Sequence, residues 1–365
     1  MNIGDNLLTD LYKWFAGVLN DWIGGWGLRA DVVSALVMAI MTIIVIVVIL
    51  LFAVFVVLTL IWLERKNAAR IQDRIGPNRV GPFGLLQPIA DTIKMLIKED
   101  IVPTNADGLV HLLAPMVTAA PAVLVFAVLP FGRGMAPADL NIGALWIVSV
   151  ASIATVGIFM AGYGSNNKFA LLGGMRAVAQ AVSYEVPQIL TIVPIVMMVG
   201  SMSLVKIVEA QSTMWFIWAF PVGPIAFIVY YISALAEVNR TPFDIPEGES
   251  EIVAGHHTEY SGMKWGLFYV AEYFNFFIIC AIATTLFFGG WQGPGFLPSY
   301  LWFIIKVYIL IWVGMWIRMT LPRMRVDQLM KFAWQVLVPI ALINIVLAGL
   351  GFDLLTLLRR LGVIS

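Results

Sequence analysis

Several ionisable residues fall inside or at the ends of long apolar segments of this 365-residue chain. They are Glu185, Glu237, Glu272, Lys306 and Arg318. A charged side chain is costly inside a bilayer, and such residues commonly mark ion or proton pathways. Lys306 has no charged neighbour in sequence, so we expect it to find a partner on another helix. A buried Glu–Lys pair that only holds the helices together is the alternative interpretation.

A second concentration of acids lies in the connection between two of these segments. Its members are Glu237, Asp244, Glu247, Glu249, Glu251, Glu259 and Glu272. Glu247 and Glu251 share a face if the segment is helical, and Glu249 joins them if it is extended. Clustered acids that are buried have raised and coupled pKa values. The pattern favours proton handling, although a solvated acidic loop is the plainer alternative.

The third feature is an arginine-rich segment, residues 64–82, which contains two Gly-Pro turns. Arginine-rich turns at a membrane face contact headgroups or bind the carboxylates of a partner. Residues 84–100 follow with an amphipathic pattern. The apolar face consists of Leu85, Leu86, Ile89, Ile93, Leu96 and Ile97, and the polar stripe of Gln87, Asp91, Lys94 and Lys98. We expect a helix that lies along the membrane surface or against a partner.

The elements that position these residues are predicted by composition: 61% of the residues are hydrophobic and only 12% are charged. We therefore predict an all-α membrane protein with eight transmembrane helices. The expected spans lie near 32–62, 109–130, 143–163, 180–200, 214–237, 265–288, 301–317 and 333–352. At about 1.5 Å per residue, the first would reach about 48 Å, so it must tilt strongly or protrude.

Orientation follows from the distribution of lysine and arginine. These residues are concentrated in the connections near 64–108, 164–179, 238–264 and 318–332. The positive-inside rule places these loops in the cytoplasm and both termini outside. No internal repeat or composition break is evident, so we predict a single polytopic membrane domain over residues 1–365.

The same composition argues against several kinds of cofactor and partner. The one cysteine, Cys280, cannot hold an iron–sulfur cluster by itself and is expected to pack in the core. His256 and His257 are adjacent and point to different faces, so we expect no metal site. Nucleotide-binding motifs are missing. The 22 basic residues are balanced by 22 acidic ones, which argues against nucleic-acid binding.

Four segments together resemble a known family. They contain ERKNAARIQDRIGPNRVGPFGLLQPIADTIKMLIKED (64–100), MRAVAQAVSYEVP (175–187), AEVNRTPFDIPEGESEIVAGHHTEYSGMKWGLFYVAEYFN (236–275) and RMTLPRMRVDQLMKFAWQVLVP (318–339). These motifs are similar to those of the H-type membrane subunits of respiratory complex I, the proton-pumping NADH:quinone oxidoreductase. The resemblance runs from about residue 50 to residue 340.

The resemblance implies a subunit that lies where the hydrophilic arm of the complex meets its membrane arm. Quinone would be the substrate, reduced by an iron–sulfur cluster in neighbouring subunits. FMN and all iron–sulfur clusters would belong to partner subunits, and this chain would hold no redox cofactor or metal. Its partners would be the other membrane and hydrophilic-arm subunits, quinone and membrane lipids.

The resemblance also implies roles for particular residues. Those expected at the quinone chamber are Glu64, Arg65, Arg74, Asp91, Arg240, Phe243 and Asp244. Those expected on a proton path are Glu185, Glu237, Glu247, Glu249, Glu251, Glu259, Glu272 and Lys306. Arg318, Arg323, Arg325 and Asp327 would pair with the acids or dock the soluble arm.

These inferences lead to one hypothesis and two alternatives. Quinone reduction creates negative charge and proton demand, which would shift the coupled pKa values of the acids and drive proton pumping. An equivalent subunit of a membrane-bound hydrogenase or formate-oxidising complex is one alternative, and a stand-alone ion transporter is the other. We expect a bacterial inner membrane, with the mitochondrial inner membrane as the alternative location.

Overall fold

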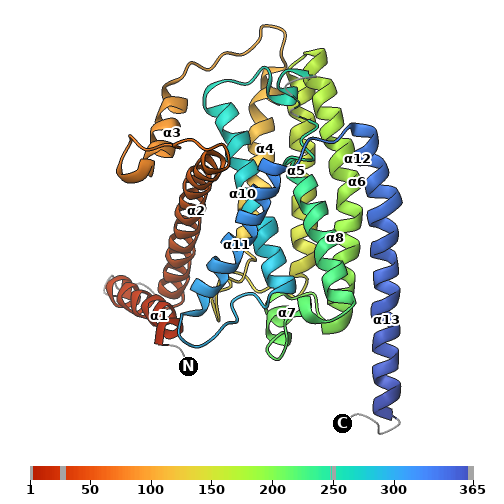
Figure 1. Ribbon diagram of the computed structural model, residues 1–365. Coiled ribbons are helices and arrows are strands. Elements are labelled where there is room, and N and C mark those ends of the chain that lie inside the picture. Colours follow the sequence, from red (N-terminus) through yellow and green to blue (C-terminus); the bar gives the residue numbers. More distant parts are fainter. Residues whose placement is uncertain (1–2, 25–29, 247, 249–251, 361–365) are drawn as a thin grey trace.

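The computed structural model describes the backbone of residues 3–24, 30–246, 248 and 252–360, with side chains at 13–23, 31–246, 248 and 252–351. Within that part every regular element is a helix, as predicted. Figure 1 shows a bundle whose long helices run side by side. Its members are α4 (Gly108–Phe126), α5 (Gly143–Gly164), α6 (Lys168–Val199), α8 (Val222–Glu237), α10 (Gly262–Phe287), α11 (Ser299–Thr320) and α13 (Val338–Arg360).

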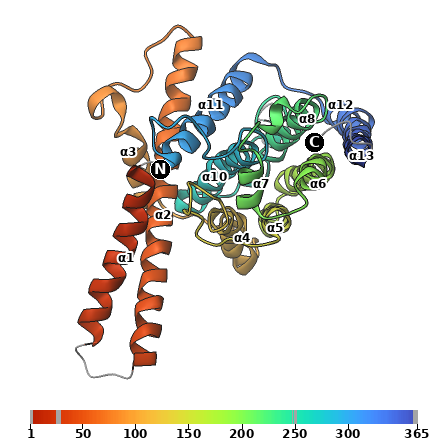
Figure 2. The same ribbon diagram turned by 90° about the horizontal axis from the view of Figure 1, so that it is seen from below.

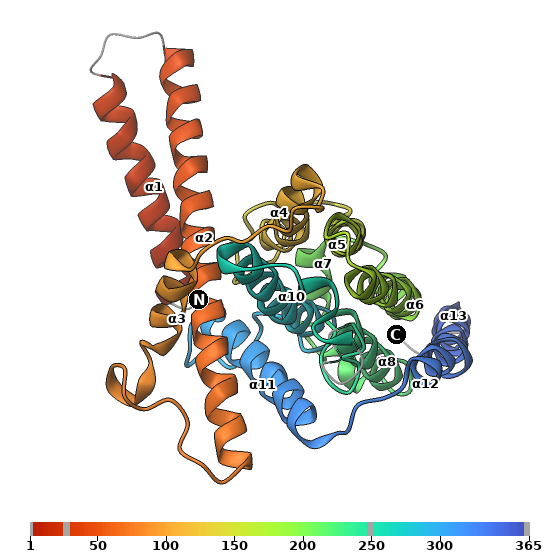
Figure 3. The ribbon, with the colours of Figure 1, turned by 90° about the horizontal axis from the view of Figure 1, so that it is seen from above.

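Helix α10 forms the centre of the bundle. It packs against α2, α4, α8 and α11, and Figure 3 shows it between them. Its side chains are buried along most of the helix between Phe268 and Phe287, because they are aromatic, aliphatic or small and meet a neighbour on every face. This rigid centre carries Glu272 near its upper end in Figure 1.

Helix α2 (Ala30–Ile71) is the predicted long helix, and it crosses the bundle obliquely (Figures 1 and 2). Its 42 residues correspond to about 63 Å. It continues past the predicted end at residue 62 and carries Glu64 and Arg65 on its last turns. Its second half packs into the core through Ala53, Val57 and Leu60. The hydropathy pattern did not predict α1 (Ile3–Gly24), which lies beside the first half of α2 (Figure 2).

The predicted count of eight spans is not confirmed. Seven described helices are long and apolar enough to cross a membrane, and α8 is apolar but has only 16 residues. The predicted span 214–237 begins too early, because Phe216–Trp218 forms a separate 3-10 turn, η2, before α8 begins at Val222. The seven helices nevertheless identify a multi-pass membrane protein.

The predicted connection 164–179 is largely wrong, because α6 begins at Lys168. The side chain of Asn167 accepts a hydrogen bond from the backbone N–H of Phe169 and caps the helix. Gly173 lies on this helix and faces Gly255 of the 3-10 turn η3 (Gly255–His257). A Cβ at position 173 would lie 2.6 Å from Cα of Gly255, so the glycine allows a close packing contact instead of breaking the helix.

The predicted amphipathic helix is confirmed as α3 (Gln87–Ile97). It packs against α2 and α10. Its polar stripe contains Asp91, which faces Arg65 of α2, whereas the apolar side chains of Ile93 and Ile97 are exposed. The helix therefore lies beside the bundle with its apolar face outward.

Three short elements complete the structure. They are the 3-10 turn η1 (Pro82–Gly84), helix α7 (Leu204–Ala210) and helix α12 (Val326–Phe332). A short π-helical segment, η4 (Ala333–Leu337), joins α12 to α13. The predicted cytoplasmic loops after α2, α8 and α11 meet at the upper end of the bundle in Figure 1, and α7 lies at the opposite end.

Candidate functional site

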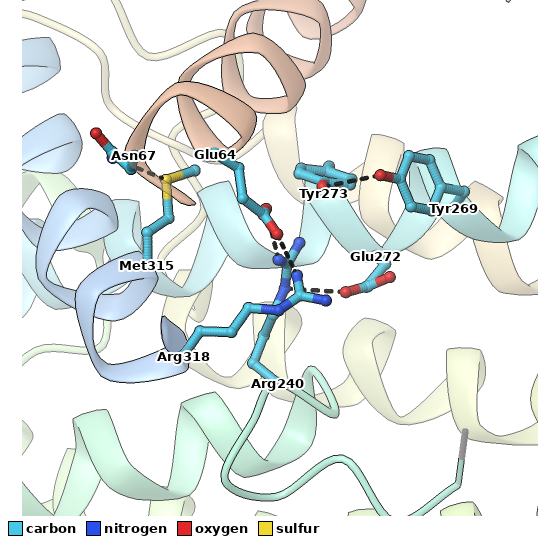
Figure 4. Close-up of polar contacts among 8 residues, drawn as sticks. All are labelled: Glu64, Asn67, Arg240, Tyr269, Glu272, Tyr273, Met315 and Arg318. Atoms are coloured by element: carbon cyan, nitrogen blue, oxygen red, sulfur yellow. Dashed lines mark hydrogen bonds and ion pairs between the residues drawn. The ribbon is translucent and has the colours of Figure 1, made fainter. Parts of the chain in front are cut away.

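Four charged side chains meet at the upper end of the bundle, and we call them the charged cluster: Glu64, Arg240, Glu272 and Arg318 (Figure 4). Nη1 of Arg240 lies 2.8 Å from Oε2 of Glu64, and Nε lies 2.9 Å from Oε1 of Glu272. The second oxygen of Glu64 binds Nη1 of Arg318 at 2.5 Å. Arg240 therefore bridges two acids, and Glu64 bridges two arginines.

Each member of the charged cluster comes from a different element. Glu64 lies on α2, Glu272 on α10 and Arg318 on the last turn of α11. Arg240 follows α8 on a tight turn in which its backbone N–H donates to the carbonyl of Leu235. Because the four residues are distant in sequence, the cluster joins elements that hydrophobic packing alone could allow to slide.

The start of the loop after α8 is held by Gln180 of α6. Its amide Nε2 donates to the carbonyls of Ala236 and Phe243, both at 2.7 Å. The backbone N–H of Met324 binds the carbonyl of Pro242 from the other side. These bonds fix Arg240 in place and satisfy carbonyls that have left the helical pattern.

Arg240 is 2% exposed and its guanidinium is also covered by aromatic rings. It stacks over Tyr273 at 4.5 Å and over Phe276 at 4.8 Å. Burial disfavours the charged form, but Glu272 and Glu64 outweigh it and hold the pKa of Arg240 well above its ordinary value. Arg240 is therefore a permanent charge, and any change of protonation in the charged cluster must occur on its acids.

A smaller ion pair lies next to the charged cluster. Nη1 of Arg65 binds Oδ2 of Asp91 at 2.5 Å, and Nε2 of Gln87 donates to the other oxygen of Asp91 at 3.1 Å. The pair is partly exposed and ties α3 to α2. It thus places the amphipathic helix beside the end of α2 that carries Glu64.

A narrow cavity lies among α4, α5, α6, α8 and α10. Most of its lining is apolar, but Glu185, Gln188, Tyr230, Glu237 and Asn275 contribute polar groups. About 70 Å³ is open to water, which is enough for several molecules. Oε2 of Glu237 is buried and has no hydrogen-bond partner among the described residues. A carboxyl oxygen in that position needs a proton or a water molecule.

The cavity and the charged cluster share one short segment. Glu237, Val238 and Asn239 line the cavity, and the next residue is Arg240. Helix α10 has the same double role, since Asn275 lines the cavity while Glu272 binds Arg240. A change of charge on one side is therefore within a few residues of the other.

Other predicted site residues lie apart from these two features. Oε1 of Glu259 accepts a hydrogen bond from Asn167, and exposed Arg74 binds the side chain of Gln72. Phe243 is buried, with its ring centroid 5.7 Å from that of Tyr184. Asp244 follows it in the same loop. Glu247, Glu249 and Glu251 lie outside the described residues.

The expectation that Lys306 finds a partner among the acids is wrong within the described chain. Its Nζ donates to the carbonyls of Phe288, Gly290 and Gln292 and lies 4.3 Å from the ring centroid of Trp215. Twelve residues separate it from Arg318, or about 18 Å along α11, so it lies at the other end of that helix. Backbone carbonyls satisfy the ammonium where no acid is near.

The residues proposed for docking lie on the loop after α11. Arg323 donates to the carbonyl of Ile245, and Arg325 and Asp327 lie at the start of α12. His256 and His257 stack on each other with their ring centroids 3.8 Å apart. In the residues described here, His, Cys, Asp and Glu form no group of three that could hold a metal ion.

Sequence reasoning missed the neutral residues that support the site. Tyr273, Phe276, Gln180 and Asn275 carry no charge and stand in apolar spans where they resemble ordinary core residues. One signal was available: an amide inside a span needs partners, because lipid offers none. Gln180 and Asn275 could have been found on that ground.

Comparison with known proteins gives consistent matches along most of the chain. The profile of the NADH dehydrogenase family matches residues 42–349. The H subunit of the NADH-quinone oxidoreductase of Dehalococcoides mccartyi is 54% identical over 292 residues, or 80% of this chain and 81% of that protein. The corresponding protein of Carboxydothermus hydrogenoformans is 51% identical over 305 residues, or 83% and 86%. One of the same name from Geobacter sulfurreducens is 51% identical over 299 residues, or 80% and 90%.

Proposed function

This chain belongs to the NADH dehydrogenase family as an H-type subunit of NADH-quinone oxidoreductase, and from that premise we propose that it couples quinone reduction to proton translocation. In this proposal the charged cluster responds to the quinone, and the cavity acids carry the proton. The observation that carries the proposal is the segment 237–240, which has Glu237 in the cavity and Arg240 in the charged cluster.

The charged cluster is suited to respond to a change of charge nearby. Its two acids and two arginines balance, so the cluster is close to neutral as a whole. Reduction of a quinone adds negative charge and demands protons, and an added negative charge favours protonation of neighbouring carboxylates. A protonated Glu64 or Glu272 would release Arg240 from one of its ion pairs, and the freed charge would act on Glu237.

The cavity supplies the next step of the proposed path. Glu237 and Glu185 line the same space, and water in that space would connect their carboxyl groups. Two acids in one small cavity cannot easily both be ionised, so a proton added to one affects the other. Glu185 lies on α6 two residues before Pro187, where the helix lacks one backbone donor.

The quinone would approach from the side of α3. Arg65, Asp91 and Gln87 form a polar edge there, and the exposed apolar face of α3 suits contact with the isoprenoid tail or with lipid. Phe243 is buried against Tyr184, so contact between its ring and a quinone requires movement of the loop. We keep Lys306 outside the proposed path because it lies at the opposite end of α11.

The remaining elements of the proposal follow from the family. The partners would be the other membrane subunits and the hydrophilic arm, which would hold FMN and the iron–sulfur clusters. The three relatives named above are bacterial proteins, which favours the bacterial plasma membrane as the location. Arg323, Arg325 and Asp327 lie at the upper end of the bundle, on the side expected to face the hydrophilic arm.

Glu237→Gln tests the proposal in the assembled complex. Glu209→Gln, in the exposed part of α7, is the matched control because it makes the same change on a helix far from the cavity. We expect E237Q to lower proton translocation and inhibitor-sensitive quinone reduction about tenfold or more, as for loss of a proton-transfer group. Electron transfer from NADH to an artificial acceptor in the hydrophilic arm should stay normal in both variants.

Two outcomes would contradict the proposal. One is full proton translocation by an assembled E237Q complex. The other is an equal loss in E209Q, which would show that any change of a glutamate disturbs this subunit.

A further inference from the structure

A second built feature lies at the opposite end of the bundle, and we call it the outer cleft. It lies between the α4–α5 connection, the segment 212–215 after α7 and the segment 291–302 that leads into α11. Its volume is about 500 Å³. The lining includes Arg133, Ser212, Trp215, Trp291, Ser299 and Trp302. The proposed function does not involve any of these residues.

The walls of the outer cleft are held by two buried polar side chains. Lys306 reaches up from α11 and donates to three carbonyls of the segment 288–292, with Trp215 packed over its ammonium. Gln211 accepts hydrogen bonds from the backbone N–H groups of Phe216 and Gly289, and donates to the carbonyl of Thr285. A lysine and an amide are therefore used to fix two surface loops relative to each other.

Glycines allow the indole rings to lie flat against these loops. A Cβ at Gly293 would lie 2.5 Å from Cγ of Trp302, and one at Gly289 would lie 2.7 Å from Cδ1 of Trp215. The Nε1 of Trp302 donates to the carbonyl of Pro294 at 2.9 Å, which sets the orientation of that ring. The aromatic surfaces of the cleft are thus positioned before any ligand arrives, as in binding sites that are largely pre-formed.

Charge identifies the chemistry of the ligand. Arg133 is the charged residue of the lining, it is exposed, and it has no ion-pair partner among the described residues. Its own backbone N–H is fixed by Ser299, whose Oγ accepts at 3.2 Å. A guanidinium fork beside indole rings favours a phosphate group attached to a partly apolar molecule.

The position of the cleft distinguishes a lipid from a soluble anion. It opens where α10 ends and α11 begins, at the end of the bundle that also carries α7 (Figure 1). Exposed aromatic residues stand around it: Phe296 is 72% exposed and meets Trp302 edge to face, and Trp218 and Phe220 are exposed on the neighbouring loop. Aromatic side chains in that arrangement mark the membrane–water interface, where lipid headgroups lie.

We propose that the outer cleft binds the headgroup of an anionic phospholipid from the outer leaflet, with Arg133 on the phosphate and the indoles of Trp215 and Trp302 along the glycerol and upper acyl chain. Lys306 and Gln211 are positioning residues, which hold the walls and do not touch the lipid. This assigns the intramembrane lysine a role separate from proton transfer.

The test uses the assembled complex in native membranes supplied with photoactivatable phosphatidylglycerol, followed by peptide mapping of the label on this chain. We expect label on the segment 288–302 in the unmodified complex. Arg133→Gln should reduce it about fivefold, the effect of removing one cation beside an anionic lipid. Arg133→Lys should keep most of it. Lys206→Gln is the matched control, because Lys206 is exposed on α7 at the same end but does not line the cleft.

Gly293→Ala provides a second variant that keeps the charge. Its added Cβ must displace the ring of Trp302, so label should fall although Arg133 is intact. Four results would overturn the proposal: no label on this segment in the unmodified complex, equal label in R133Q, equal label from photoactivatable phosphatidylcholine, or loss of label when inorganic phosphate is added. The last would identify a soluble-anion site, and the first would indicate that a partner subunit covers the cleft.

Discussion

Substitution of Arg240 by methionine removes the residue on which the charged cluster depends. Arg240 makes ion pairs at 2.8 and 2.9 Å with two acids, and only 2% of its surface is exposed. At an effective dielectric constant of about 20, each pair is worth about 6 kcal/mol before desolvation is counted. Desolvation cancels much of this, but removing one partner of a buried pair leaves an uncompensated charge and costs about 3–5 kcal/mol.

The comparison with Arg318→Met makes this prediction quantitative. Arg318 also binds Glu64, but 31% of its side chain is exposed and it serves a single acid. Solvent screening lowers its expected contribution to about 1 kcal/mol. We therefore expect R240M to destabilise the subunit several times more than R318M, although both remove one positive charge next to the same glutamate.

The assay is the thermal midpoint at which the purified complex loses inhibitor-sensitive quinone reduction, together with the amount of complex assembled. Glu272→Gln in the R240M background should recover part of the loss, because it removes one of the two acids left unpaired. If R240M and R318M shift the midpoint equally, or if E272Q adds to the loss in R240M, Arg240 is not the residue that compensates these acids.

Two further predictions separate the parts of the structure. Asp91→Asn should change stability by less than about 1 kcal/mol, since the side chain of its partner Arg65 is 41% exposed, yet it should raise the KM for a short-chain quinone; an unchanged KM in titrations of the assembled complex would remove α3 from the proposed approach route. Lys306→Met should lower the thermal midpoint by an amount equivalent to about 1–3 kcal/mol, because buried carbonyls lose their donor, while protons translocated per NADH stay normal in the remaining complex; a lower ratio would return Lys306 to the proton path.

Sequence patterning could predict the helices because their signal is local. The apolar run after Asp31 required a helix too long to stand upright, and α2 is long and oblique. The alternation of residues 84–100 predicted α3. Gly173 and Gly174 pointed the wrong way: glycines read as helix breakers, whereas Gly173 lies inside α6 and allows close packing on Gly255.

The pairings of the site could not be predicted, because they depend on which helices become neighbours. Glu64 and Arg240 are 176 positions apart, and Glu64 and Arg318 are 254 apart. Lys306 shows the limit most clearly. Its type and location correctly indicated that it needs a partner, but sequence gives no means of choosing between a distant acid and carbonyls that a nearby loop folds over the helix.

Infrared difference spectroscopy of the assembled complex tests the central claim most directly, by comparing carboxyl bands before and after quinone reduction. We predict a band from a protonated carboxyl group that changes on reduction, disappears in E237Q and is retained in E209Q. A band that changes identically in E237Q and in the unmodified complex would show that Glu237 keeps its protonation state, and would contradict the coupling of the charged cluster to the cavity.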